Sequence, residues 1–245
     1  SQYITLPDST RLAVSYWLNA QNIDTQEKSP AIVNTTRYWR ARSYHDDQLK
    51  HEFFYEAASY FCSKGYVFVI VDVRGTGASF GHRDTEITQE EVEDINPIIE
   101  WVSQQPWCNG KVATEGTSYT ANTTLYSLVT APPSLKLGVC RAPDFDDYRN
   151  LVAPGGIVNR WFVRTWGLCV KALDQNDVDA LYADGYSPPP ACGTDNVLGV
   201  RPVDEDTDGS LLAAAIADHK ANYSLVEMEE SLHYIDNPLY DNHRA

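Results

Sequence analysis

Three serines follow a glycine at the spacing Gly-x-Ser, which is found around the nucleophile of many enzymes that attack carbonyl groups: Ser79, Ser118 and Ser187. Only Ser79 completes the longer pattern Gly-x-Ser-x-Gly, within residues 77–81. A chain of ordinary glycine and serine content contains about one Gly-x-Ser by chance. The short pattern alone therefore does not identify a nucleophile, and the elements around each serine must be considered.

A nucleophilic serine needs a sharp turn between a strand and a helix, so that its hydroxyl is exposed and the first helical amides face the developing oxyanion. Ser118 has this context, because residues 111–116 are predicted to form a strand and residues 119–129 a helix. Gly116 permits a tight turn, while Thr120 stands where a second glycine is usual. Ser79 is followed by a polar loop instead. The sequence favours Ser118 as the nucleophile, and the alternative is an ordinary loop or helix-capping serine.

The elements that must position these residues alternate between strands and helices. Strands are predicted at 11–18, 31–33, 66–71, 111–116 and 137–140, and helices at 53–61, 88–102 and 119–129. Thr88 and Glu91 form a capping-box pattern, whereas Pro97 predicts a kink or a later start of its helix. The alternation predicts an α/β fold with a mostly parallel sheet, whose chemistry lies at the carboxyl ends of the strands.

After about residue 150 the pattern changes. Helices are predicted at 162–173, 211–223 and 225–234, separated by the proline-rich segment 187–190, and no further strand is predicted. We therefore divide the chain into an α/β core, residues 1–150, and a helical cap or lid, residues 151–245.

The charge of the chain excludes several classes of function. Of the 245 residues, 19 are Lys or Arg and 34 are Asp or Glu, which gives a net charge of −15. Such an acidic protein is not expected to bind nucleic acid phosphates or anionic membranes. No apolar stretch approaches the roughly 18 residues of a transmembrane helix, and no signal-like run is visible. We expect a soluble protein, and the sequence does not indicate its compartment.

One acidic segment has the spacing of a metal site. Residues 204–209 copy the start of a calcium loop, but Ala215 stands where the loop needs its bidentate glutamate. A solvated loop that caps the helix at 211–223 is favoured over a calcium site. We predict neither a metal nor a cofactor.

The sequence around Ser118 resembles a known family. Residues 105–112, Gln-Pro-Trp-Cys-Asn-Gly-Lys-Val, and 116–119, Gly-Thr-Ser-Tyr, are similar to motifs of the CocE/NonD serine hydrolases. These are the relatives of cocaine esterase, X-prolyl dipeptidyl-peptidase and α-amino acid ester hydrolase. The segments 6–13, 72–81 and 153–156 resemble further family motifs in the same order, and the match departs at Ser9 and Ala121, where the family has glycine. The resemblance implies an α/β-hydrolase core with a helical cap.

The resemblance also implies roles for individual residues. Ser118 is implied as the acylated nucleophile, with the amide of Tyr119 and the phenol of Tyr38 as the two donors of the oxyanion hole. Three tryptophans are implied as substrate contacts: Trp39, Trp161 and Trp166. Without the resemblance, Tyr38 and the two cap tryptophans are better explained as packing residues.

The acid and base of a catalytic triad stay unassigned. In α/β-hydrolases they follow the serine on later strands, and no such strand is predicted after residue 140. Residues 237–241 resemble the motif that ends the family's cap. We therefore expect the triad Asp and His on a further segment or a second polypeptide, with an unpaired sheet edge on this chain. His219, His233 and His243 are expected to face solvent, and none is assigned as the base.

Three functions stay open. The first is cleavage of small carboxylic esters or amides through an acyl-enzyme on Ser118. The second is an X-Pro dipeptidyl-peptidase, α-amino acid ester hydrolase or β-lactam acylase activity, which is favoured if the acidic residues at 144–147 lie in the pocket. The third is a hydrolase-like binding subunit without catalysis.

Overall fold

The centre of the computed structural model is a six-stranded sheet with the strand order β1-β2-β5-β3-β6-β7. Its strands are β1 (Gln2–Thr5), β2 (Arg11–Trp17), β3 (Ser29–Thr36), β5 (Val67–Asp72), β6 (Cys108–Thr117) and β7 (Leu135–Arg141). β5, β3, β6 and β7 run parallel, and β1 and β2 add antiparallel strands at one edge. The structure describes residues 1–19, 23, 27–183, 186–187, 190–232, 234–236 and 240. The predicted α/β fold with a mostly parallel sheet is confirmed.

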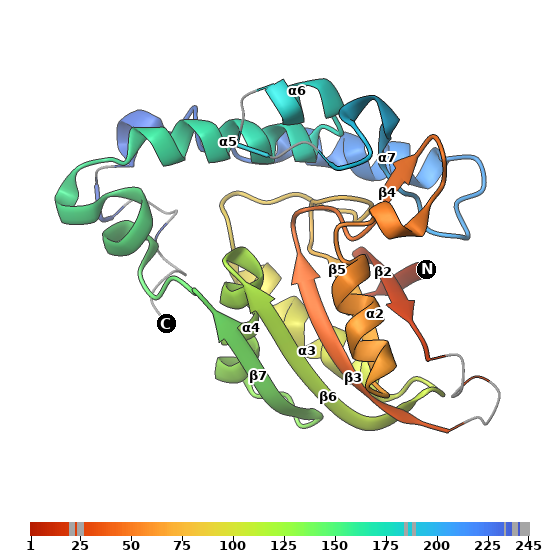
Figure 1. Cartoon of the computed structure of the whole chain (residues 1–245). Helices are drawn as coiled ribbons and strands as arrows, with labels where there is room; N and C mark the ends of the chain where they lie inside the picture. The colour runs from red at the N-terminus through yellow and green to blue at the C-terminus, as the bar shows by residue number, and fades with distance from the viewer. Residues whose placement is uncertain are drawn as a thin grey trace.

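Helices cover both faces of this sheet (Figure 1). α2 (Tyr55–Ser63) lies on one face, and α3 (Gln89–Ser103) and α4 (Tyr119–Thr130) lie on the other. The side chains of β5 alternate between the two layers, with Val69 and Val71 packed toward α3 and Phe68 and Ile70 toward α2. All residues of β5 are buried. Burial on both faces explains why this strand is continuously apolar in the sequence.

Local signals set the ends of the core helices. Thr88 caps α3 by accepting a hydrogen bond of 3.2 Å from the amide of Glu91, as predicted. The helix begins at Gln89 and continues through Pro97, so the predicted later start is wrong. The buried apolar face of α3 outweighs the single backbone hydrogen bond that a proline removes. Gly65 follows α2 with a φ of +84°, which stops that helix.

A second layer of helices lies across the carboxyl ends of the parallel strands (Figure 1). It contains α5 (Arg160–Asp174), α6 (Val178–Ala183) and α7 (Ser210–Asp218). In the part of the chain that the structure describes, the remaining helices are short: η1 (Leu49–His51) in the core segment, and η2 (Tyr148–Val152), η3 (Pro154–Gly156), η4 (Thr194–Asn196), η5 (His219–Ala221) and η6 (Glu229–Ser231). The predicted helix at 225–234 is wrong, because residues 225–232, which the structure describes, form turns around η6. Across the described parts of the chain, no helix has the length and hydrophobicity of a membrane span.

The cap also contains a strand. β8 (Val197–Val200) pairs antiparallel with β4 (Arg42–Tyr44), which belongs to the core segment of the chain. The prediction that no strand follows residue 150 is therefore wrong. A strand of four residues carries little periodicity, and its partner lies about 150 residues earlier in the sequence.

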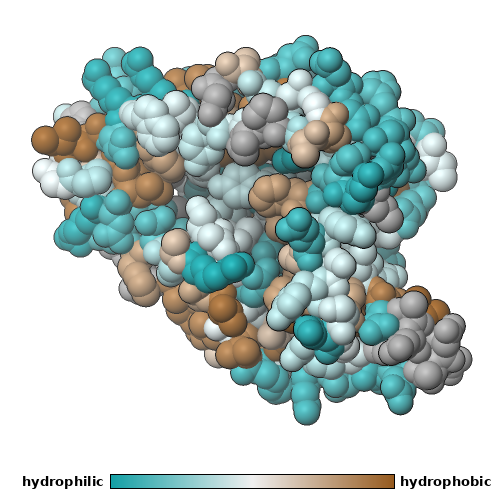
Figure 2. All heavy atoms as spheres, viewed as in Figure 1, coloured by the Kyte–Doolittle hydropathy of each residue, from teal (hydrophilic) through white to brown (hydrophobic). Residues whose placement is uncertain are grey.

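The outer edge of β7 is open and apolar. Among the described residues, β7 pairs only with β6, so its other edge has no strand beside it. Leu137 and Val139 on β7 are 57% and 45% exposed, and Leu128 and Val129 at the end of α4 are 42% and 63% exposed. Figure 2 shows apolar atoms along this side of the molecule. Unpaired strand edges of this kind are templates for further pairing.

Candidate active site

Ser118 lies on a sharp turn between β6 and α4. Its backbone has φ 60° and ψ −127°, a conformation that L residues rarely adopt. Its side chain is exposed, and its amide donates a hydrogen bond of 3.1 Å to the carbonyl of Arg141 at the end of β7. The strand, strained turn and helix that the sequence predicts are therefore present, in the form of a nucleophile elbow.

Two neighbours make this turn possible. Gly116 lies against the next helical turn, where an added Cβ would overlap the backbone carbonyl of Thr120. Thr120 replaces the usual glycine and bridges the turn, since its hydroxyl accepts from the amide of Thr117 at 2.8 Å and donates to the carbonyl of Thr117 at 3.0 Å. Ala121, where the family has glycine, is fully buried. The departures from the glycine pattern are thus compatible with the elbow.

Ser79 has a structural role instead. It is fully buried, and its hydroxyl donates to the carbonyl of Asp72 at 2.6 Å and accepts from the amide of Ala13 at 2.8 Å. A hydroxyl that is bonded on both sides and has no access to solvent cannot attack a substrate. The complete Gly-x-Ser-x-Gly pattern therefore marks a loop that joins β5 to the first hairpin.

Ser118 opens into a cavity of about 90 Å³ between the sheet and the cap. The cavity is lined by Tyr38, Glu86, Ile87, Ser118, Tyr119, Asn122, Asp144, Asp147, Leu151, Val152, Phe162, Trp166, Tyr186 and Leu225. Four of the six residues that the sequence assigns to the site are in this lining. A mostly apolar cavity with a few convergent polar groups is typical of a small-molecule site.

Tyr38 follows β3 and brings its phenol into the cavity. Its ring contacts the ring of Tyr119 edge-on, with 6.0 Å between centroids. Its hydroxyl oxygen accepts a hydrogen bond of 3.1 Å from the indole nitrogen of Trp166. Burial raises the pKa of Tyr38 above its usual range, so the phenol is neutral at pH 7 and has a proton to donate. This is the state that an oxyanion donor requires.

Tyr119 contributes its backbone and its side chain in different ways. Its amide is at the start of α4, where the first amides have no carbonyl of their own helix to bind. Its phenol points into the core and donates a hydrogen bond to the carboxylate of Glu91 on α3. Burial, followed by the charge of Glu91, raises the pKa of Tyr119 well above its usual range. The side chain therefore anchors the helix start, and the same residue lines the cavity beside Ser118.

Of the three tryptophans that the resemblance implies as substrate contacts, one lines the cavity and two do not. Trp166 lines the cavity and stacks on Phe162, with 5.3 Å between ring centroids. Trp39 is 1% exposed and donates from its indole nitrogen to the carbonyl of Leu173 at 3.0 Å, so it anchors α5 and does not line the cavity. Trp161 is 68% exposed and is also outside the lining. The implied substrate contacts of Trp39 and Trp161 are not made by this cavity.

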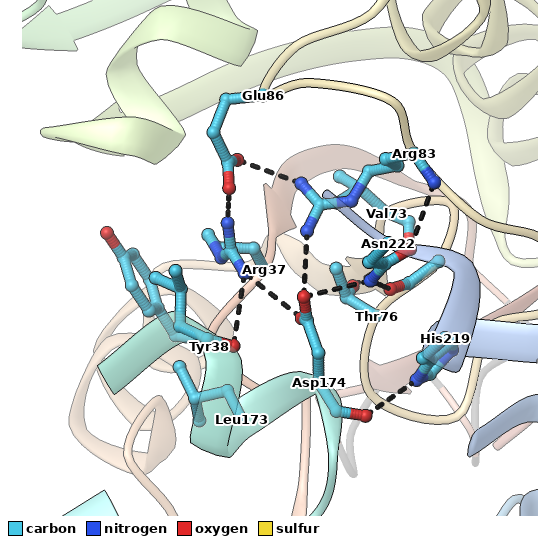
Figure 3. Close-up of polar contacts among 12 residues, drawn as sticks. Arg37, Tyr38, Val73, Thr76, Arg83, Glu86, Leu173, Asp174, His219 and Asn222 are labelled. Carbon is cyan, nitrogen blue, oxygen red and sulfur yellow. Dashed lines mark hydrogen bonds and ion pairs between the residues drawn. The ribbon is translucent and has the colours of Figure 1, made fainter. Parts of the chain in front are cut away.

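A buried ion cluster behind Tyr38 was not found from the sequence. Arg37 and Arg83 lie with the carboxylates of Glu86 and Asp174 between their guanidinium groups (Figure 3). All four side chains are buried, and Glu86 also lines the cavity. The only sequence signal is the position of Arg37 next to Tyr38, because the other three residues lie in loops or at a helix end. Tertiary contacts alone bring them together.

His219 is also buried, which corrects the expectation that it faces solvent. It is 3% exposed, and its ring nitrogens lie 3.1 Å from the carbonyl oxygen of Asp174 and 2.7 Å from that of Ser79. Burial lowers the pKa of His219. Among the described residues, no histidine lines the cavity, and His233, His243 and most of the segment 237–241 lie outside the described residues.

The acidic loop before α7 has the capping role that the sequence favours. The carboxylate of Asp206 accepts hydrogen bonds from the amides of Leu211 and Leu212 at 3.1 Å and 2.8 Å. Asp204, which would begin a calcium loop, binds the amino group of Ser1. Both carboxylates therefore have structural partners in the chain.

The sequence of this chain is similar to a family of hydrolytic enzymes and to individual esterases. The family described as X-Pro dipeptidyl-peptidase (S15 family) matches residues 8–227. The chain is 35% identical, over 96% of its length, to a Mycobacterium bovis protein named as a serine esterase, and it spans 38% of that protein. It is 30% identical to the cocaine esterase of a Rhodococcus species over 49% of this chain and 22% of the esterase.

The fold of this chain is also similar to that of a solved hydrolase structure. A CocE/NonD family hydrolase from Staphylococcus aureus superposes on all of this chain with a TM-score of 0.66 and 17% identity, and the chain covers 37% of it. At this identity the similarity shows the fold, which is that of an α/β-hydrolase. The chain thus spans about 38% of the first curated relatives it matches. The family match and the curated relatives together show that the chain belongs to the X-Pro dipeptidyl-peptidase (S15) family.

Proposed function

We propose that this chain supplies the nucleophile and the oxyanion hole of a serine hydrolase that cleaves carboxylic esters or amides. The observation that carries the proposal is the strained, exposed turn of Ser118, which opens into the same cavity as the phenol of Tyr38. Strain at a solvent-facing serine before a helix is costly and is typical of a nucleophile elbow. The names of the relatives as esterases and peptidases support the same chemistry.

The reaction follows from this arrangement. The Oγ atom of Ser118 attacks the carbonyl carbon while a histidine base takes its proton, and the carbonyl electron pair moves to oxygen. The amide of Tyr119 and the hydroxyl of Tyr38 donate hydrogen bonds to this oxyanion. Collapse of the intermediate expels an alcohol or amine, which receives the proton from the histidine. Water then attacks the acyl-enzyme by the same steps and releases the carboxylic acid.

The triad acid and base are proposed to come from a further segment or a second polypeptide. The open, apolar edge of β7 supports this proposal, because in α/β-hydrolases the acid and the base follow later strands of the sheet. The greater length of the relatives is consistent with it. Pairing of further strands with β7 would bury Leu137 and Val139 and close the edge.

A second candidate is hydrolysis of substrates that carry a free amino group. Asp144 and Asp147 line the cavity near Ser118, and the described lining contains no lysine or arginine. Burial, followed by the charge of Asp147, raises the pKa of Asp144, so a bound ammonium group would relieve unfavourable charge there. This activity predicts that an aminoacyl ester is cleaved faster than its N-acetyl form, and that Asp147→Asn reduces this preference about tenfold or more. Equal rates for both esters would exclude it.

A fluorophosphonate probe tests the main proposal in the full-length protein. We expect covalent labelling at Ser118, mapped by peptide mass spectrometry, and loss of labelling and of ester hydrolysis in Ser118→Ala. Ser79→Ala is the matched control for the complete Gly-x-Ser-x-Gly pattern, and its folded fraction is expected to be labelled like the wild type. Absence of labelling in the folded, full-length wild type would instead support a binding subunit without catalysis.

A further inference from the structure

Three consecutive residues after β3 are held by the cap helix α5. The guanidinium of Arg37 pairs with the carboxylate of Asp174 at 3.0 Å, and the indole of Trp39 donates to the carbonyl of Leu173. Between them, Tyr38 accepts a hydrogen bond from the indole of Trp166, also on α5. The segment that carries the phenol is therefore fixed on both sides by the same helix.

We infer that Trp166 is a positioning residue that aims the hydroxyl proton of Tyr38 at the oxyanion formed on Ser118. An indole nitrogen is a donor only, so the bond of 3.1 Å must run from Trp166 to the oxygen of Tyr38. This bond occupies one lone pair of the phenol and leaves its own proton to be donated elsewhere. Tyr38 and Ser118 line one cavity, so the free proton can be donated to a carbonyl oxygen that is bound in this cavity. The inference rests on the proposed function.

The orientation of Trp166 is itself fixed by the core. Its ring is 8% exposed and stacks on Phe162 at an interplanar angle of 13°. The guanidinium of Arg37 lies 5.3 Å from the centre of the same ring. Arg37 is fully buried and also pairs with Glu86, so it cannot move independently of the core (Figure 3). The donor that orients Tyr38 is thus preorganised before any substrate binds.

The surroundings also keep Tyr38 in the donating form. In Figure 3 its phenol extends away from the ion cluster behind it. Burial raises the pKa of Tyr38, while the bond from Trp166 acts in the opposite direction and favours the phenolate. The phenol is therefore neutral at pH 7 and more acidic than burial alone would make it, and both properties strengthen it as a hydrogen-bond donor to an anion.

The test is a double-mutant cycle on the rate at which Ser118 is modified, measured as phosphonylation by a fluorophosphonate and as acylation by an ester substrate. Trp166→Phe keeps an aromatic ring and removes the N–H group together with part of the indole ring system, so the double-mutant cycle separates the effect of the hydrogen bond from the effect of lost packing. We expect it to lower the rate roughly tenfold, a part of the 10²- to 10³-fold that loss of an oxyanion donor costs. In a Tyr38→Phe background the same substitution should have little further effect. Trp101→Phe, a half-buried tryptophan on α3, is the matched control and should change neither rate.

An equal effect of Trp166→Phe in both backgrounds would overturn the inference, because Trp166 would then act as a substrate or packing contact. A second measurement does not need activity. With 3-fluorotyrosine at position 38, the fluorine resonance should titrate at a higher pH in Trp166→Phe than in the wild type. An unchanged titration in a folded variant would also overturn the inference. If the wild type fails to label at Ser118, the proposed function fails, and the titration still decides whether the bond orients Tyr38.

Discussion

Ser118 keeps a backbone conformation that costs roughly 1–3 kcal/mol for an L residue, and local contacts hold it there. Its amide binds the end of β7, and the hydroxyl of Thr120 bridges the turn through both backbone groups of Thr117. Gly116 has an ordinary φ, so its role is steric: only hydrogen fits against the carbonyl of Thr120. The turn that carries Ser118 therefore depends on the absence of a side chain at Gly116 as much as on Ser118 itself.

Substitution of Gly116 by alanine tests the steric role. We expect Gly116→Ala to lower the free energy of unfolding by about 1–3 kcal/mol, measured by urea denaturation, because the methyl group overpacks the turn. Its folded fraction should also label more slowly with a fluorophosphonate, since Ser118 is displaced. Gly110→Ala in the same strand is the control. Gly110 has a φ of +82° and open space around its Cβ position, so it should lose some stability without losing labelling.

At the scale of elements, the ion cluster joins the cap to the core. Asp174 at the end of α5 binds Arg37, lies 3.6 Å from a guanidinium nitrogen of Arg83, and accepts a hydrogen bond of 2.8 Å from Asn222. Removing one partner of a buried ion pair leaves an uncompensated charge. The position of the cap over the site therefore depends on these buried charges as well as on the apolar cluster that packs Leu173 of α5 with Trp39 and Ala78.

We expect Asp174→Ala to lower the free energy of unfolding by about 3–5 kcal/mol, because two buried guanidinium groups lose a partner. The measurement is urea denaturation followed by circular dichroism. Lys171→Ala on the same helix removes an exposed ion pair with Glu227 and should change stability little. Similar losses in both variants would contradict a special role for the buried cluster.

His219 connects the loop after β5 to the end of α5, and it gives this contact a pH dependence. Burial holds its pKa below the ordinary value of 6.5, so the unfolded chain binds more protons than the folded chain as the pH falls through that value. The contribution of His219 to the free energy of unfolding is therefore greatest above about pH 6.5 and decreases at lower pH. Asp72 acts in the opposite sense, because burial raises its pKa to about 6.

Denaturation of the wild type and of His219→Gln between pH 8 and pH 5 separates these effects. Asp72 is present in both proteins, so the difference between the two curves reports on His219. We expect the stability advantage of the wild type to shrink as the pH falls below 6.5. A constant difference across this range would show that His219 does not titrate differently in the folded state.

At the scale of the whole molecule, the open edge of β7 is the feature that a longer protein would cover. Leu137→Asp places a charge at a position that is 57% exposed in this chain. We expect a small effect on the free energy of unfolding in the segment 1–245 and, in a longer form that contains the proposed further strands, a loss of at least about 2 kcal/mol, because the charge would be buried there. Tyr60→Asp on the outer face of α2, where Tyr60 is 59% exposed, should have a small effect in both lengths. Equal effects of Leu137→Asp in both lengths would contradict pairing at β7.

The core of the fold, and the strand, turn and helix around Ser118, could be predicted from the sequence without a structure. The apolar run of β5, the capping pair of Thr88 and Glu91, and the glycine before Ser118 act through neighbours within a few residues. Such signals are written in the periodicity and turn chemistry of the chain, so they can be read without a structure. For the same reason the sequence distinguished Ser118 from Ser79, despite the misleading pattern at Ser79.

Which distant residues share the site depends on tertiary contacts. Trp39 and Trp166 are both plausible substrate contacts from sequence, yet Trp39 is buried against α5 and Trp166 lines the cavity. The burial of His219 and the pairing of β8 with β4 likewise depend on contacts between segments more than 100 residues apart. No local pattern encodes these contacts, because they arise only when the cap packs on the carboxyl ends of the strands and selects which side chains it covers.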